Sequence, residues 1–163
     1  MPDTTQDAVS LRLTRTIKAP PQKVFDAWVD PAQRMQWWRA NEDMTCDLCT
    51  FDAKVGGAYR INMKSPDGEH EYITVGEILE YDPPHRLVTT WTWEVDCRQP
   101  GDTSPPTVGT IVTLDFKPVK GGTELTLTHT GFADAPQRDD HHKGWTGCLN
   151  TLQQRLDEGE LRS

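Results

Sequence analysis

The residue best placed for acid–base chemistry is His129. It follows Leu125 and Leu127 at every second position of a segment that reads as a strand, so its imidazole shares their inward face. A neutral imidazole there can orient the polar end of a ligand or act as a base. The other interpretation is a histidine of the core or of the strand's end, with its ring nitrogens satisfied by hydrogen bonds within the protein.

Arg15 raises a similar question in an earlier strand. It alternates with Leu11, Leu13 and Ile17, which places it on the apolar face. A buried guanidinium must be paired, and its partner is an acidic side chain, a backbone carbonyl or a ligand anion. Of these arrangements we expect an internal structural pair.

Two further pairs carry side chains that can ligate metals. Cys46 and Cys49 have the spacing of zinc and redox sites, but no second pair accompanies them and their segment reads as strand or loop. His141 and His142 are adjacent residues that do not face one site on a helix, and we expect them to be solvated. The sequence therefore predicts no metal site and no cofactor, and all four cysteines are expected as reduced thiols.

Motifs of the common catalytic classes do not occur in the chain. It holds no serine elbow, phosphate loop, dinucleotide-binding glycine pattern or zinc-protease helix. This argues against an enzyme and identifies no catalytic residue. A pocket enzyme of the cyclase or hydrolase kind, working through His129 or Arg15, is kept as an alternative.

Aromatic side chains and a few hydroxyl groups on inward positions are the ingredients of an apolar binding site. Each of the six tryptophans fits a core position by itself, whereas as a set some of them are expected to face a pocket. Tyr72 is the least fixed, because both faces of its strand carry apolar residues. The candidate ligand-binding residues are Trp38, Tyr59, Ile61, Met63, Tyr72, Thr89, Trp91, Trp93, Thr110, Leu114, His129, Trp145 and Leu149.

The elements that position these residues follow from the spacing of apolar side chains. Tight turns between successive strands indicate an antiparallel sheet, and the long C-terminal helix can bury its apolar stripe only against the apolar face of that sheet. The fold class is therefore α+β. The predicted strands are 10–17, 44–49, 58–64, 69–81, 87–95, 110–116 and 124–130, the predicted helices are 21–29, 32–38 and 138–158, and 98–107 is a surface loop.

Composition limits the class of partner. The formal net charge is −8 and the basic residues are scattered, which argues against nucleic acid and anionic membranes. No apolar run approaches the roughly 18 residues of a membrane span, and the N-terminus lacks a signal-peptide pattern, so a cytoplasmic protein is expected. Residues 1–9 are predicted to be a flexible segment and 10–163 a single domain, either monomeric or paired through edge strands as a homodimer.

Stretches distributed from about Ser10 to Glu158 resemble the START-like SRPBCC superfamily, and within it bacterial proteins related to the activator of the heat-shock protein 90 ATPase. The resemblance implies a helix-grip fold, in which a curved antiparallel sheet of about six or seven strands wraps around the C-terminal helix and leaves a pocket between them. Members of the superfamily bind lipids, sterols, polyketides or plant hormones, and a few are enzymes. The matching stretches are 15–28, Asp30–Pro31, Trp37–Trp38, 55–60, 76–88, Thr90–Trp91, 122–129, and Gly144–Trp145 with Leu149 and Leu152 behind them.

Three functions are consistent with these observations. The first is a binding module that holds a small apolar molecule in the internal pocket, and it is the one we expect. The second is the pocket enzyme described above. The third is a co-chaperone-like protein that stimulates a chaperone ATPase through its sheet surface, which the family name suggests but no exposed apolar stripe in the sequence supports.

Overall fold

The computed structural model describes residues 9–95 and 109–161. The predicted N-terminal segment, apart from Val9, and the predicted loop 98–107 lie outside this range. The helices and strands are β1 (Val9–Ile17), α1 (Pro21–Val29), α2 (Pro31–Arg34), β2 (Cys49–Phe51), β3 (Ala58–Lys64), β4 (Glu71–Asp82), β5 (Arg86–Val95), β6 (Thr110–Val119), β7 (Gly122–Phe132) and α3 (Ala135–Asp157).

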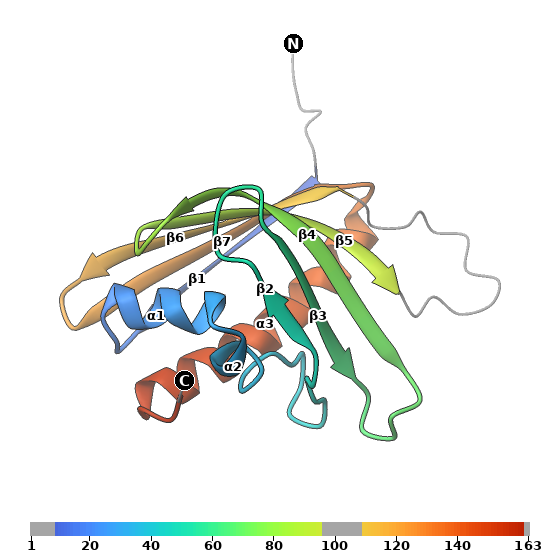
Figure 1. The fold of residues 1–163 in the computed structure, drawn as a ribbon, viewed down its shortest axis with the longest axis horizontal. Helices are drawn as coiled ribbons and strands as arrows, with labels where there is room; N and C mark the ends of the chain where they lie inside the picture. The colour runs from blue at the N-terminus through green and yellow to red at the C-terminus, as the bar shows by residue number, and fades with distance from the viewer. Residues whose placement is uncertain (1–8, 96–108, 162–163) are drawn as a thin grey trace, which may run out of the picture.

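The seven strands form one antiparallel sheet in the order β1-β7-β6-β5-β4-β3-β2. The sheet curves, and α3 runs across its concave face (Figure 1). The helix α1 packs against β6 and β7, and α2 packs against β2. The pairing of β4 with β5 shifts register between Ile73 and Thr74 and again between Ile78 and Glu80. Such bulges bend a strand and increase its twist, which helps the sheet to wrap around a helix. The predicted helix-grip fold is confirmed.

Local sequence signals explain where α3 begins and which face it buries. Asp134 caps the helix, because its carboxylate accepts a hydrogen bond from the backbone N–H of Gln137 at 2.9 Å. An apolar stripe then faces the sheet, and glycine at position 147 lets the helix lie against the backbone at Ala40. The stripe consists of Trp145, Cys148, Leu149, Leu152 and Leu156.

The predicted helix 32–38 is shorter than expected, since α2 ends at Arg34 and a turn follows. The reason lies in the adjacent residues Trp37 and Trp38, which are both fully buried. On a regular helix two adjacent side chains diverge by about 100°, which does not suit the complete burial of two large indoles side by side. The turn brings both indoles into the core, where Trp37 donates its N–H to the carbonyl of Ala27 at 2.9 Å.

The predicted strand 44–49 is wrong over most of its length. Only Thr45 makes an isolated bridge, to Lys64, and the strand proper starts at Cys49. The side-chain carbonyl of the buried Asn62 accepts the backbone N–H groups of Asp47 and Leu48, both at 3.0 Å. These two donors are thereby removed from the ladder that a continuous strand would have formed.

Two glycines of α3 provide a test of how tightly the helix packs. A Cβ atom at Gly147 would lie 1.7 Å from the carbonyl oxygen of Ala40, whereas a Cβ at Gly144 would meet nothing within 4 Å. We expect Gly147→Ala to lower the free energy of unfolding by at least about 2 kcal/mol through overpacking. Gly144→Ala, the matched control, should raise it by about 0.5–1 kcal/mol through helix propensity. Urea denaturation of both variants measures this, and equal stabilities would contradict the packing described.

Candidate functional site

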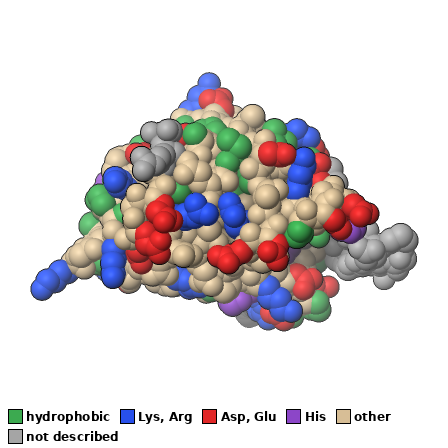
Figure 2. Space-filling model, turned by 90° about the horizontal axis from the view of Figure 1, so that it is seen from below, with side chains coloured by type: hydrophobic (Ala, Val, Ile, Leu, Met, Phe, Trp, Pro, Cys, Tyr) green, Lys and Arg blue, Asp and Glu red, His purple; other side chains and the backbone are tan. Residues whose placement is uncertain are grey.

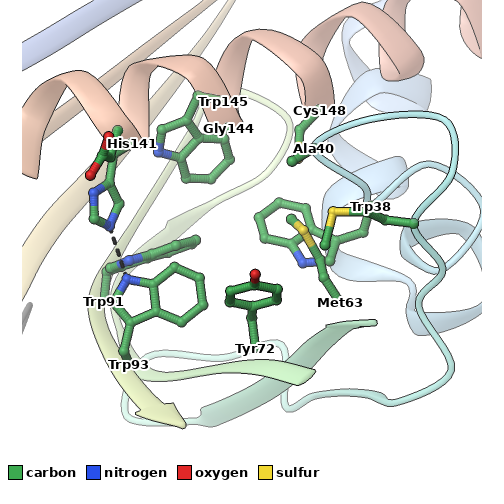
Figure 3. A pocket seen from close by; sticks show the side chains of 12 residues that line it. Trp38, Ala40, Met63, Tyr72, Trp91, Trp93, His141, Gly144, Trp145 and Cys148 are labelled. Atoms are coloured by element: carbon green, nitrogen blue, oxygen red, sulfur yellow. Dashed lines mark hydrogen bonds between the residues drawn. The ribbon is translucent and has the colours of Figure 1, made fainter. Parts of the chain in front are cut away.

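A cavity of about 260 Å³ lies between α3 and the concave face of β3, β4 and β5. Indole rings form most of its wall, and the lining is almost entirely apolar (Figure 3). The polar side chains Asp140 and His141 come from the first turns of α3. The lining residues are Trp38, Ala40, Met44, Met63, Tyr72, Trp91, Trp93, Asp140, His141, Gly144, Trp145 and Cys148.

The structure separates the predicted ligand-binding residues into three groups. Trp38, Met63, Tyr72, Trp91, Trp93 and Trp145 line the cavity. Tyr59, Thr89 and Leu114 line a second, much smaller cavity of about 10 Å³, which shares the walls formed by Trp91 and Trp145. Ile61, Thr110, His129 and Leu149 are buried but line neither cavity.

The indoles are held against one another by edge-to-face and tilted ring contacts. Trp145 lies 5.0 Å from Trp91 and 5.3 Å from Trp38, measured between ring centroids, and Trp91 lies 5.5 Å from Trp93. Aromatic pairs at these distances contribute about 0.5–1.5 kcal/mol each beyond the area that they bury. The wall is therefore preformed.

His129 takes part in a closed hydrogen-bond network behind this wall. The Thr110 hydroxyl donates to the carbonyl of Trp91 at 3.0 Å, so its oxygen accepts from Nε2–H of His129 at 2.7 Å. The indole N–H of Trp145 donates to Nδ1 of His129 at 3.0 Å. The imidazole is thus neutral with its proton on Nε2, and both nitrogens are occupied. Burial lowers the pKa of His129 well below its ordinary value, and the nearby His141 lowers it further.

His141 was expected to be solvated, and this expectation is wrong. Its ring is partly buried and accepts the indole N–H of Trp93 at Nε2, at 2.9 Å, as Figure 3 shows. Its Nδ1–H donates to the carbonyl of Gln137 at 2.8 Å. Burial lowers the pKa of His141. The sequence held a signal, because His141, Trp145 and Cys148 recur at helical spacing; His142 is exposed, as expected.

Arg15 is half-exposed, so the expectation of burial is wrong. Its guanidinium donates to the side-chain carbonyl of Asn150 at 3.3 Å and to the backbone carbonyl of Thr14 at 3.1 Å. Position 15 does face α3, as the alternation predicts, but β1 is an edge strand and water reaches the charged end. Arg15 lines neither cavity.

Among the described residues the buried cation is Arg34, which no pattern in the sequence singles out. Only 5% of it is exposed, and its guanidinium carbon lies 4.8, 5.4 and 4.2 Å from the ring centroids of Trp28, Trp37 and Trp38. It donates to the backbone carbonyl of Trp28 at 2.9 Å. Burial lowers the pKa of Arg34.

The cysteines of the described chain are free thiols in an apolar environment. Burial raises the pKa of Cys46 to about 11 and that of Cys148 to about 12, and it raises the pKa of Cys49 as well. Thiols with raised pKa values are poor nucleophiles and poor metal ligands at neutral pH. Within residues 9–95 and 109–161, no three acidic, histidine or cysteine side chains are grouped so that they could hold a metal ion.

Comparisons with known proteins agree with this architecture. The family model described as Activator of Hsp90 ATPase homolog 1-like protein matches residues 18–157. No curated protein matches the chain. No helix in the described part of the chain is long and apolar enough to cross a membrane.

Several solved structures are similar over nearly their whole length. A protein of Chromobacterium violaceum is 28% identical, with 91% of this chain and 96% of that chain covered and a TM-score of 0.76. An AHSA1 protein of Silicibacter pomeroyi is 25% identical, with 93% and 99% covered and a TM-score of 0.77. An AHSA1-like protein of Aeromonas hydrophila is 21% identical, with 94% and 96% covered and a TM-score of 0.75, and it shows the fold alone.

The neutral state of the two histidines predicts a pH dependence of stability. In the unfolded chain a histidine takes up a proton below about pH 6.5, whereas folded His129 does not, so acid favours the unfolded state. We expect the free energy of unfolding to fall below this pH by up to about 1.4 kcal/mol per pH unit for each such histidine. His129→Gln should reduce this slope, whatever its effect on stability at neutral pH.

His142→Gln is the matched control, because His142 is exposed on the same helix as His141. Urea denaturation at a series of pH values gives the slopes. An unchanged slope in His129→Gln would contradict a neutral, buried His129.

Proposed function

This chain belongs to the Activator of Hsp90 ATPase homolog 1-like family, and we propose that it binds a small hydrophobic molecule in the cavity between α3 and the sheet. The observation that carries the proposal is the preformed wall of Trp38, Trp91, Trp93 and Trp145 around a space of about 260 Å³. Apolar side chains that leave such a space unfilled lose packing contacts that a closed core would keep. A cavity kept open by rigid rings is typical of a binding site.

The shape and chemistry of the wall indicate a planar, largely apolar ligand. Indole faces and edges pack well against flat rings, and the flexible side chains of Met44 and Met63 can adapt to an irregular outline. The volume is slightly below the range of about 300–1,000 Å³ for drug-sized ligands, which favours a compound of one or two rings over a sterol. A polar substituent of the ligand would lie beside Asp140 and His141.

An enzyme that uses His129 or Arg15 is less well supported. A general base needs a free lone pair within reach of the substrate. In His129 the lone pair of Nδ1 already accepts from Trp145, and Nε2 carries a proton that is donated to Thr110. Arg15 lies away from both cavities. These contacts favour structural roles for both residues.

A co-chaperone function has little support from the described surface. Among the described large hydrophobic residues, only Val55 and Leu79 are exposed. Figure 2 shows charged side chains of both signs distributed over one face, with hydrophobic side chains in small separate areas. A stable docking site needs a contiguous apolar patch at its centre.

Cavity filling tests the proposal directly. Gly144 lines the cavity, and a Cβ added there would meet no protein atom within 4 Å, so we expect Gly144→Leu to occupy part of the cavity and block the ligand while the fold stays intact. We expect the protein to bind the neutral fluorophore N-phenylnaphthylamine saturably, and Gly144→Leu to weaken this binding at least about tenfold. The measurement is a fluorescence titration.

The matched control is Lys143→Leu, which adds the same side chain at an exposed position of α3. It should leave the titration unchanged. Native mass spectrometry of freshly purified protein, compared with the denatured mass, identifies any molecule that is carried through purification. Absence of saturable fluorophore binding, or equal binding by Gly144→Leu, would refute the cavity as a ligand site.

A further inference from the structure

The small cavity behind the tryptophan wall is surrounded by hydrogen-bond donors that the protein does not satisfy. It measures about 10 Å³ and lies between α1, α2 and the strands β3, β5 and β6. Three of these lining residues carry a buried N–H group without an acceptor among the described residues: Nε1 of Trp28, Nε of Arg34 and Nε1 of Trp91. A buried donor without an acceptor is destabilising. Because all three belong to residues that line one small space, we look for a common acceptor there.

The charge at this cavity is also uncompensated. Arg34 forms no ion pair with any residue in the described ranges, and a guanidinium keeps its proton even when it is buried. The ionisable groups that interact with it are Cys46, Cys49, Cys148 and the phenol of Tyr59. Burial raises the pKa of all four, so none of them supplies a negative charge at neutral pH.

The three indole faces around Arg34 reduce this deficit without removing it. A cation–π contact stabilises the charge but supplies neither a counter-charge nor an acceptor for the N–H groups of the guanidinium. The contacts with Trp28, Trp37 and Trp38 also occupy the faces of the guanidinium and leave its edge free for a hydrogen bond in the plane. The edge atom Nε is the one without an acceptor.

The remaining lining residues favour an anion over a water molecule. A water needs acceptors for its own hydrogens as well as donors. Here the indole N–H of Trp145 is used on His129, and the Tyr59 hydroxyl donates to the carbonyl of Thr90 at 2.7 Å. The other side-chain oxygen of the lining, that of Thr89, is hydrogen-bonded to the Tyr59 hydroxyl, so both oxygens are already engaged. A donor-rich space beside an unpaired cation suits a negatively charged occupant.

We propose that this cavity binds one halide ion, chloride under cellular conditions, through the guanidinium of Arg34 and the indole N–H groups of Trp28 and Trp91. The volume corresponds to about one water-sized probe sphere, so a monatomic anion requires the smallest movement of the walls, and a carboxylate, sulfate or phosphate would require a larger one. Since Trp91 also lines the large cavity, the ion fixes part of the wall of the proposed ligand site. The halide site does not depend on what the large cavity binds.

Stability in different sodium salts at constant ionic strength tests the halide site. A ligand that binds only the folded protein raises its stability in a saturable manner. In urea denaturation the transition midpoint should rise with chloride and with bromide and then level off, whereas gluconate and acetate should have no such effect. Arg34→Met should abolish the halide response, and Arg12→Met, at an exposed position of β1, should retain it.

A milder variant and a direct observation cover the case in which Arg34→Met does not fold. Trp28→Phe keeps an aromatic ring beside Arg34 but removes one N–H donor, so it should weaken the apparent halide affinity by about fivefold to tenfold. Crystals grown in sodium bromide should show an anomalous scattering peak between Arg34, Trp28 and Trp91. Equal midpoints in chloride and gluconate, a response to acetate as large as that to chloride, or crystals without a bromide peak would overturn the proposal.

Discussion

The position of Trp145 on α3 determines how the rest of the domain is arranged. Its ring contacts Trp28, Trp38 and Trp91 at centroid distances of 6.1, 5.3 and 5.0 Å, and its N–H is donated to His129. These partners come from α1, the segment after α2, and two strands. A single side chain therefore connects α3 to β5, to β7 and to the segment that contains α1 and α2. The contacts of Trp145 hold α3 at a certain distance from β3 and β4. The cavity exists because the side chains of these strands do not fill the space in between.

Polar groups buried next to these rings act mainly as positioning devices. His129 and His141 each bind one indole N–H, of Trp145 and Trp93, and each is held in one tautomer by a second partner. A tryptophan that turned out of the wall would leave a buried donor and a buried acceptor unpaired, which is costly in an apolar interior. The histidines thus fix the orientation of the rings, and this use requires that both remain neutral.

Much of the fold could be predicted because each element has only one way to bury its apolar side. The alternation in 110–116 and 124–130 marks the inward face, and the stripe from Trp145 to Leu156 fits only the concave side of the sheet. Alternation identifies the face but not what lies opposite. Ile61 and Leu149 point inward as predicted and meet other core side chains, whereas Met63, one inward position further along β3, meets the cavity. The difference depends on the distance between α3 and the sheet at each residue. The spacing of apolar residues in the sequence contains no information about that distance.

The least predictable feature of the structure is the burial of Arg34, because a charged side chain normally remains in contact with water. Arginine is rarely buried without a partner, and a four-residue helix gives no periodicity from which its direction can be inferred. Its burial follows from its neighbours. Because Trp37 and Trp38 both turn inward, the backbone after α2 is drawn against the core, and the side chain of Arg34 is enclosed between their rings and that of Trp28. The tryptophans that shape the large cavity therefore also create, on their other side, a small positively charged space, and the packing of one cannot change without affecting the electrostatics of the other.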